Sequence, residues 1–114
     1  MTTKDLRTMT ASVLASMREY MADGDAGYGE ADVVRCGEIL EQCIAAAAQA
    51  SAAVDYLAAV EAAVKELNTL NAECEHGLIE TMERESICEV IIQAGAARGF
   101  NDEDEDITEQ WREW

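Results

Sequence analysis

Apolar residues recur at spacings of three and four along most of the chain, and none of its 114 residues is a proline. This periodicity places apolar side chains on one face of a helix, and the strongest helix breaker is missing. Hydrophobic residues make up 49% of the chain but aromatic residues only 5%, so small side chains must build much of the core. The sequence therefore predicts an all-α fold, a compact four-helix up-and-down bundle with short loops.

The apolar stripes and the glycines set the expected limits of the helices. The glycine-rich loop from Asp23 to Gly29 separates the first two helices. No glycine or proline divides the second helix from the third, but one rod of about 45 residues would be about 68 Å long. We therefore expect a break between Ala50 and Ala53 with Ser51 as the cap, and one continuous helix is the alternative. The first helix is expected to start after Thr3 and to run to about Ala22, and the second to run from about Glu30 to Gln49. The third should run from the break to near His76 and Gly77, and the fourth from Thr81, its N-cap, to Gly99, with Gly77 and Gly99 as C-terminal caps.

The buried stripe of each helix follows from the same spacing. The expected inward residues are Leu6, Met9, Val13, Met17 and Tyr20 in the first helix, Val33, Cys36, Leu40, Cys43, Ile44 and Ala47 in the second, Leu57, Val60, Val64, Leu67, Leu70 and Cys74 in the third, and Ile87, Cys88, Ile91 and either Ala94 or Gly95 in the fourth.

An acidic C-terminal segment, residues 101–114, is expected to follow a helical-bundle domain of residues 1–100. The segment opens with the charge run NDEDED, which would not fold by itself. Ile107, Trp111 and Trp114, at positions i, i+4 and i+7, would share one face of a short helical turn. Because tryptophans are poorly suited to water, we expect the segment to pack on the bundle or on a second copy. The alternative is an anchor for a partner protein.

Polar residues gather at the predicted corner between the third and fourth helices. Asn68 and Asn71 would need hydrogen-bond partners if they are buried. Arg84 follows Glu80 by four residues and is interpreted as half of an exposed intrahelical ion pair. If Arg84 is buried instead, we expect it to tie this corner to the C-terminal segment.

The charge balance limits the classes of partner. Asp and Glu number 24 against 8 Lys and Arg, which gives a net charge of −16. Nucleic acid and anionic membranes are poor partners for this chain, since both need a basic patch. A basic protein or metal cations would be attracted, although the acid could serve only to keep the protein in solution.

The N-terminus has no apolar signal region and no stretch is apolar enough to span a membrane, so we expect a cytoplasmic protein.

Cys36 and Cys43 lie seven residues apart on one predicted helix, about 10 Å along its axis, which is too far for a disulfide. All four cysteines are therefore expected to be reduced and buried.

One possible metal site involves the only histidine. Glu73 and His76 have the i, i+3 spacing by which one helix face ligates a metal in di-iron carboxylate bundles. Such a site needs a second pair, which only a symmetric dimer could supply, and an exposed histidine near a helix end explains the pattern as well. Zinc at Cys74, His76 and Cys88 is no stronger, because the Cys-x-x-Cys spacing is absent.

Two Glu-x-x-Glu pairs offer a different metal chemistry. Glu38 with Glu41 and Glu80 with Glu83 resemble the carboxylate pairs of the all-α nucleotide pyrophosphohydrolases. That resemblance implies a magnesium- or manganese-dependent phosphohydrolase. The family's second acidic pair, a Glu followed by an Asp, is missing at its expected distance, and no basic residues gather to receive a triphosphate.

We expect a non-enzymatic protein-interaction module without a cofactor, because the net charge is extreme and no catalytic set is complete. It would act as a homodimer or as the binder of a basic partner, as a bacterial antitoxin, an immunity protein or a nucleic-acid mimic does. The alternatives are the phosphohydrolase and a structural subunit that dimerises through its alanine-rich faces.

Overall fold

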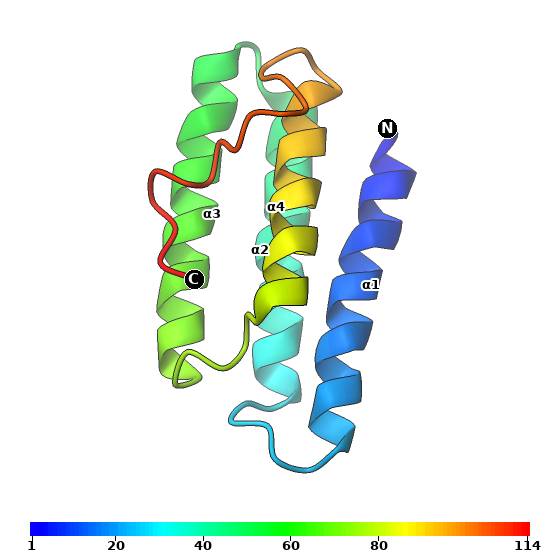
Figure 1. The fold of residues 1–114 in the computed structure, drawn as a ribbon. Helices are drawn as coiled ribbons and strands as arrows, with labels where there is room; N and C mark the ends of the chain where they lie inside the picture. Colours follow the sequence, from blue (N-terminus) through cyan, green and yellow to red (C-terminus); the bar gives the residue numbers. More distant parts are fainter.

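The computed structural model describes residues 1–114 as four helices without a strand, and consecutive helices run antiparallel (Figure 1). This confirms the predicted all-α four-helix bundle. The connections between helices are short, as an up-and-down bundle requires. The helices are α1 (Thr3–Ala22), α2 (Glu30–Gln49), α3 (Ala53–Glu73) and α4 (Thr81–Ala96).

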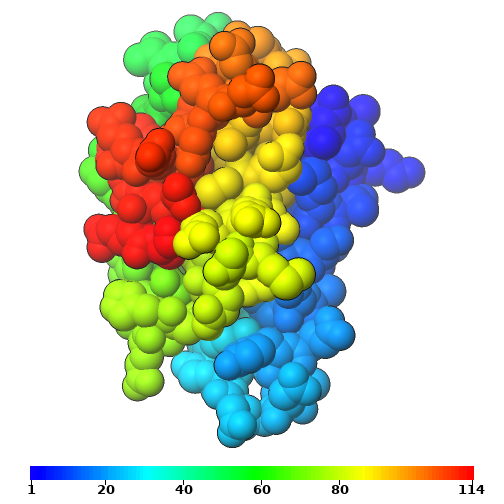
Figure 2. All heavy atoms as spheres, in the orientation of Figure 1, coloured from blue at the N-terminus to red at the C-terminus, as the bar shows by residue number.

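The four helices are not equally spaced around the core. α1 packs against α2 and α4, and α2 also packs against α3 and α4, but α3 and α4 make few contacts with each other. Residues 97–114 run from the end of α4 across to α3, coloured orange to red in Figure 1. Figure 2 shows their atoms between those of α3 and α4 on this face. The C-terminal segment therefore covers the seam between α3 and α4.

The core is one cluster of 25 buried hydrophobic residues, drawn from all four helices, from the α3–α4 corner and from Ile107 in the C-terminal segment. Tyr56 is its largest fully buried side chain. Its hydroxyl donates a 2.7 Å hydrogen bond to the carbonyl oxygen of Ile91, which satisfies the one polar group that this ring brings into the core.

Two tyrosines differ from the predicted stripes. Tyr56, which the prediction omitted, is buried because it lies four residues before Val60 on the same helix face. Tyr20, which the prediction placed inside, is 48% exposed. Its ring stacks on that of Tyr28 in the α1–α2 loop, with 6.2 Å between ring centroids.

The break between α2 and α3 lies where it was predicted, at residues 50–52, but Ser51 is not the cap. Ala52 occupies the N-cap position and no side chain caps α3. At the other side of the break, the Arg98 guanidinium donates to the carbonyl oxygens of Ala47 and Ala48, both at 2.7 Å. Basic groups at the last carbonyls of a helix stabilise it.

The predicted ends of α3 and α4 need correction. α3 ends at Glu73, and the left-handed residues of the corner are Glu75 and His76, with φ of 56° and 61°, rather than Gly77. Thr81 is the first residue of α4 and Glu80 is its N-cap, whose N–H donates to the Glu83 carboxylate at 3.3 Å. α4 ends at Ala96, and Gly99, with φ of 73°, belongs to the turn that follows.

The absence of a side chain at Gly95 allows the C-terminal segment to turn back onto α4. A Cβ atom there would collide with the Asn101 amide oxygen and would lie 2.7 Å from the Tyr56 ring. The Asn101 amide donates to the carbonyl oxygen of Ile92 at 3.1 Å. Gly95 thus lets Asn101 reach the end of α4.

Candidate interaction surfaces

Asn71 holds the corner between α3 and α4. The side chain is only 3% exposed, and its Oδ1 atom accepts hydrogen bonds from the backbone N–H groups of Leu78 at 3.1 Å and Ile79 at 2.9 Å. Buried backbone donors without a partner are costly. The Asn71 amide therefore fixes the path of the chain as it enters α4.

Asn68 holds the C-terminal segment instead. Its Nδ2 atom donates to the carbonyl oxygen of Trp111 at 2.8 Å, and its Oδ1 atom accepts from the N–H of Glu113 at 3.0 Å. The Asn68 side chain thus donates one hydrogen bond to the backbone of the C-terminal segment and accepts another from it. Asn68 and Asn71, one turn apart on α3, thus position two different segments.

The C-terminal segment also contributes apolar contacts. Ile107 is 8% exposed and Thr108 is fully buried, while Trp111 and Trp114 are half-buried and pack against the core. The residues around Thr108 form hydrogen-bonded turns, in which the N–H groups of Trp111 and Arg112 both donate to the Thr108 carbonyl oxygen. Ile107 and the two tryptophans therefore contact the bundle of their own chain.

Arg112, and not Arg84, is the arginine of this segment. Arg84 is half-buried and its side chain forms no ion pair or hydrogen bond. The Arg112 guanidinium lies 3.2 Å from the Asp106 carboxylate and 5.5 Å from the centre of the Trp114 ring. Burial acts to raise the pKa of Asp106, but hydrogen bonds from Thr108 and the charge of Arg112 lower it below the usual range.

The cysteines are free thiols, three of them buried and Cys88 half-buried. Burial raises the pKa of Cys36 to about 12 and that of Cys43 to about 11, so these thiols stay protonated and unreactive at neutral pH. The Cys88 sulfur lies 3.4 Å from the Thr108 hydroxyl. The C-terminal segment therefore partly covers Cys88.

The candidate metal ligands are not gathered. Glu73 and His76 are both exposed, one at the end of α3 and the other on the corner. No three His, Cys, Asp or Glu side chains come close enough together to hold a metal ion. The two Glu-x-x-Glu pairs line different grooves, one on each side of α1.

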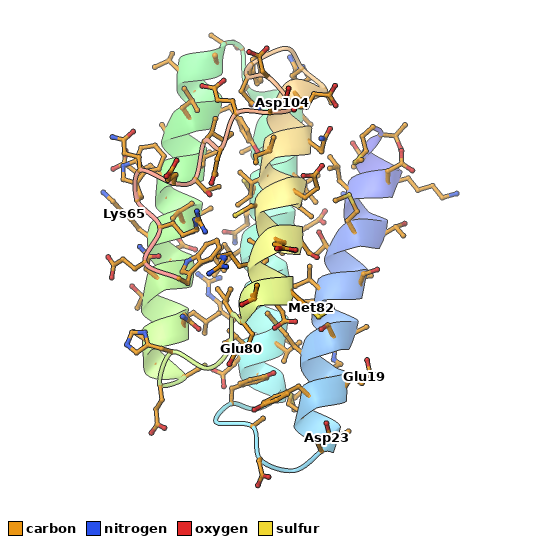
Figure 3. All side chains as sticks on the ribbon, in the orientation of Figure 1. Glu19, Asp23, Lys65, Glu80, Met82 and Asp104 are labelled. Atoms are coloured by element: carbon orange, nitrogen blue, oxygen red, sulfur yellow. The ribbon has the colours of Figure 1, made fainter.

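The groove that Glu80 and Glu83 line, here called the acidic groove, lies between the end of α1 and the start of α4. Four carboxylates line it, and the large apolar side chains of Tyr20 and Met82 are 48% and 74% exposed within it. Ser16 donates to the Glu83 carboxylate at 2.8 Å across the groove. Figure 3 labels four of its residues, Glu19, Asp23, Glu80 and Met82, toward the lower end of the bundle in that view. Its carboxylates belong to Glu19, Asp23, Glu80 and Glu83.

The second groove, here called the balanced groove, lies between α1 and α2 and has a volume of about 640 Å³. Its apolar lining consists of Ala11, Leu14, Val34 and Gly37. Two ion pairs join the helices across its ends, Arg7 with Glu41 at 2.6 Å and Arg18 with Glu30 at 2.7 Å. Glu38 and Gln42 also line it without an ion pair.

No helix in the structure combines the length and the apolar character needed to cross a bilayer. Comparison with protein-family models, with curated proteins and with solved structures found no match for this chain. The fold and its surfaces are therefore the basis for a functional proposal.

Sequence reasoning named Glu80 and Glu83 as metal candidates and missed the acidic groove. Tyr20 was assigned to the core, and Met82 was not considered. The signal was the position of Met82 in the first turn of α4, two residues after Glu80, where the apolar stripe of that helix has not yet begun.

Proposed function

We propose that the protein is a non-enzymatic, cytoplasmic protein-interaction module that binds a basic protein partner through the acidic groove. The observation that carries the proposal is the exposure of Tyr20 and Met82 between four carboxylates. Single exposed apolar residues are normal on a protein surface, but here two large ones share one groove with concentrated charge.

This combination suits a partner that is both cationic and apolar. The carboxylates and the net charge of −16 would attract lysine and arginine side chains and would speed the encounter. Tyr20 and Met82 would supply the apolar contact, for which tyrosine and the adaptable methionine are well suited. An amphipathic basic helix has both properties. Antitoxins, immunity proteins and nucleic-acid mimics would fit within this class.

The phosphohydrolase alternative requires the two Glu-x-x-Glu pairs to meet at one metal. Glu38 and Glu41 line the balanced groove, whereas Glu80 and Glu83 line the acidic groove. Glu41 is paired with Arg7, and the Glu83 carboxylate accepts from Ser16. No contact favours this alternative, so the interaction module is the better-supported proposal.

The test is calorimetric binding of the full chain to two synthetic peptides of equal positive charge. One peptide carries leucine at helical spacing opposite its lysines, and the other carries alanine at those positions. We expect the leucine peptide to bind more tightly, and the double variant Tyr20→Ala, Met82→Ala to weaken it by about tenfold, which corresponds to about 1.4 kcal/mol.

The matched control is Val54→Ala, because Val54 is 71% exposed on α3 and lies outside both grooves. This variant should bind the leucine peptide as the parent chain does. Equal affinity for the two peptides would show that only charge is recognised, and the proposed groove would then be wrong.

A further inference from the structure

We propose that a second copy of this chain docks on the balanced groove, with the two-fold axis of the dimer parallel to α1 and α2. This inference does not rest on the basic-partner proposal, because the two grooves lie on opposite sides of α1. At 100° per residue, the two sets of lining residues point roughly 170° apart around that helix. A dimer and a basic partner could therefore bind at once.

Charge is the first argument for a second copy at this place. Two copies that each carry −16 repel one another, so they should meet where acid is least concentrated. α1 is the only helix in which basic side chains outnumber acidic ones, three against two. α2, across the groove, has one basic side chain against four acidic ones. The basic side chains of α1 are Lys4, Arg7 and Arg18.

The middle of the groove is apolar, which supplies the second argument. Val34 is 46% exposed there and stands beside Ala11 and Leu14. A Cβ atom at Gly37 would lie only 2.8 Å from the Leu14 side chain. The glycine therefore lets Leu14 lie against α2, and the groove keeps an apolar floor between its two ion pairs.

The size of this face is compatible with a weak dimer. Helices of 20 residues are about 30 Å long, and two of them side by side are about 20 Å wide, which gives a footprint of roughly 600 Å². Stable interfaces bury about 800 Å² per partner, and transient ones bury less. We therefore expect association in the micromolar range rather than a permanent dimer.

Charge also selects the direction of the two-fold axis. An axis parallel to the helices places α1 of one copy on α2 of the other at equal heights, so that Arg7 comes within about one helical turn of Glu38 in the second copy. An axis perpendicular to the helices, within the interface, places α1 on α1 and α2 on α2. Arginines would then approach arginines and glutamates would approach glutamates, which is unfavourable.

Sedimentation equilibrium of the full chain, up to about 1 mM, tests the existence of the dimer. We expect a concentration-dependent dimer. The Val34→Glu variant should raise its dissociation constant at least tenfold. The matched variant Val54→Glu adds the same charge at an exposed valine on α3 and should leave the dimer nearly unchanged. A monomer throughout, or equal effects of the two variants, would overturn the proposal.

A second pair of variants tests the axis. Glu38→Lys and Glu85→Lys make the net charge less negative by the same amount, and neither glutamate is in an ion pair. Glu85 lies on α4, away from the groove. With the axis parallel to the helices, Glu38→Lys should weaken the dimer by about threefold or more although it reduces the overall repulsion. If it strengthens the dimer as Glu85→Lys does, α2 faces α2 and the proposed axis is wrong.

Discussion

At the scale of single residues, two asparagines on α3 show how similar side chains acquire different roles. Asn71 is buried and accepts from two backbone N–H groups of the corner, whereas Asn68 is half-buried and bonds to the backbone of the C-terminal segment. The sequence indicated that both need partners if buried. It could not show which segment each one meets, because that depends on the packing of distant elements.

We predict that Asn71→Ala destabilises the fold much more than Asn68→Ala does. Loss of Asn71 leaves two buried N–H groups without an acceptor, at about 2–4 kcal/mol in total, whereas loss of Asn68 removes bonds at a partly hydrated site, at about 1 kcal/mol. Urea unfolding at neutral pH measures both values. Equal losses in the two variants would mean that Asn71 does not hold the corner.

A second prediction concerns the buried thiols and alkaline pH. The pKa of Cys36 is raised from 9.0 to about 12 by burial, so this thiol stabilises the fold fully below pH 9 and the contribution is lost as pH rises toward 12. The free energy of unfolding should fall above pH 9, by up to about 1.4 kcal/mol per pH unit for each such thiol.

The measurement is urea unfolding at pH 8 and pH 10 with a reductant present. Cys36→Ala should be less stable than the parent chain at pH 8 because of lost packing, but should lose less stability between the two pH values. An equally steep loss in the parent and the variant would show that the Cys36 thiol ionises as easily in the folded chain as in the unfolded one.

At the scale of elements, α1 and α2 follow their sequence patterns because loops rich in glycine or short in length limit them. α3 ends before its predicted position, since Glu75 and His76 adopt the left-handed conformations that the nearby Gly77 was expected to take. The N-cap of α4 is Glu80 instead of Thr81, and the helix ends at Ala96, before Gly99. α3 and α4 make few contacts with each other, and the apolar stripes of the two helices do not predict this. The path of the C-terminal segment between them was therefore open to several predictions.

We predict that Ile107→Ala loosens the C-terminal segment more than the helices. Truncating a buried isoleucine costs about 2–4 kcal/mol, and the segment has few other apolar anchors. Because Thr108 covers Cys88, reaction of that thiol with an aromatic disulfide reagent should accelerate while the three buried thiols stay slow. Met82→Ala, remote from the segment, is the control. An unchanged Cys88 rate would show that Ile107 does not hold the segment down.

At the scale of the whole molecule, charge is the dominant property. Four of the five ion pairs join side chains that are each at least 42% exposed, and such pairs contribute little. A net charge of −16 therefore acts mainly as self-repulsion, which salt screens. Under the two proposals made above, the same surplus of acid would attract cations to the acidic groove and would confine self-association to the balanced groove.

We predict that added sodium chloride raises the thermal midpoint, by a few degrees between about 0.01 and 0.5 M, because screening relieves this repulsion. Calorimetry or circular dichroism at a fixed, low protein concentration keeps dimerisation from contributing. A midpoint that falls with salt would mean that the exposed ion pairs outweigh the repulsion.

The most direct test of the interaction proposal is nuclear magnetic resonance of the ¹⁵N-labelled full chain during addition of the basic amphipathic peptide. We predict that amide shifts concentrate at the end of α1 and the start of α4, around Tyr20 and Met82, and that the acidic residues 102–106 change little. Shifts spread over every acidic stretch, with residues 102–106 affected as strongly as the groove, would contradict a specific site.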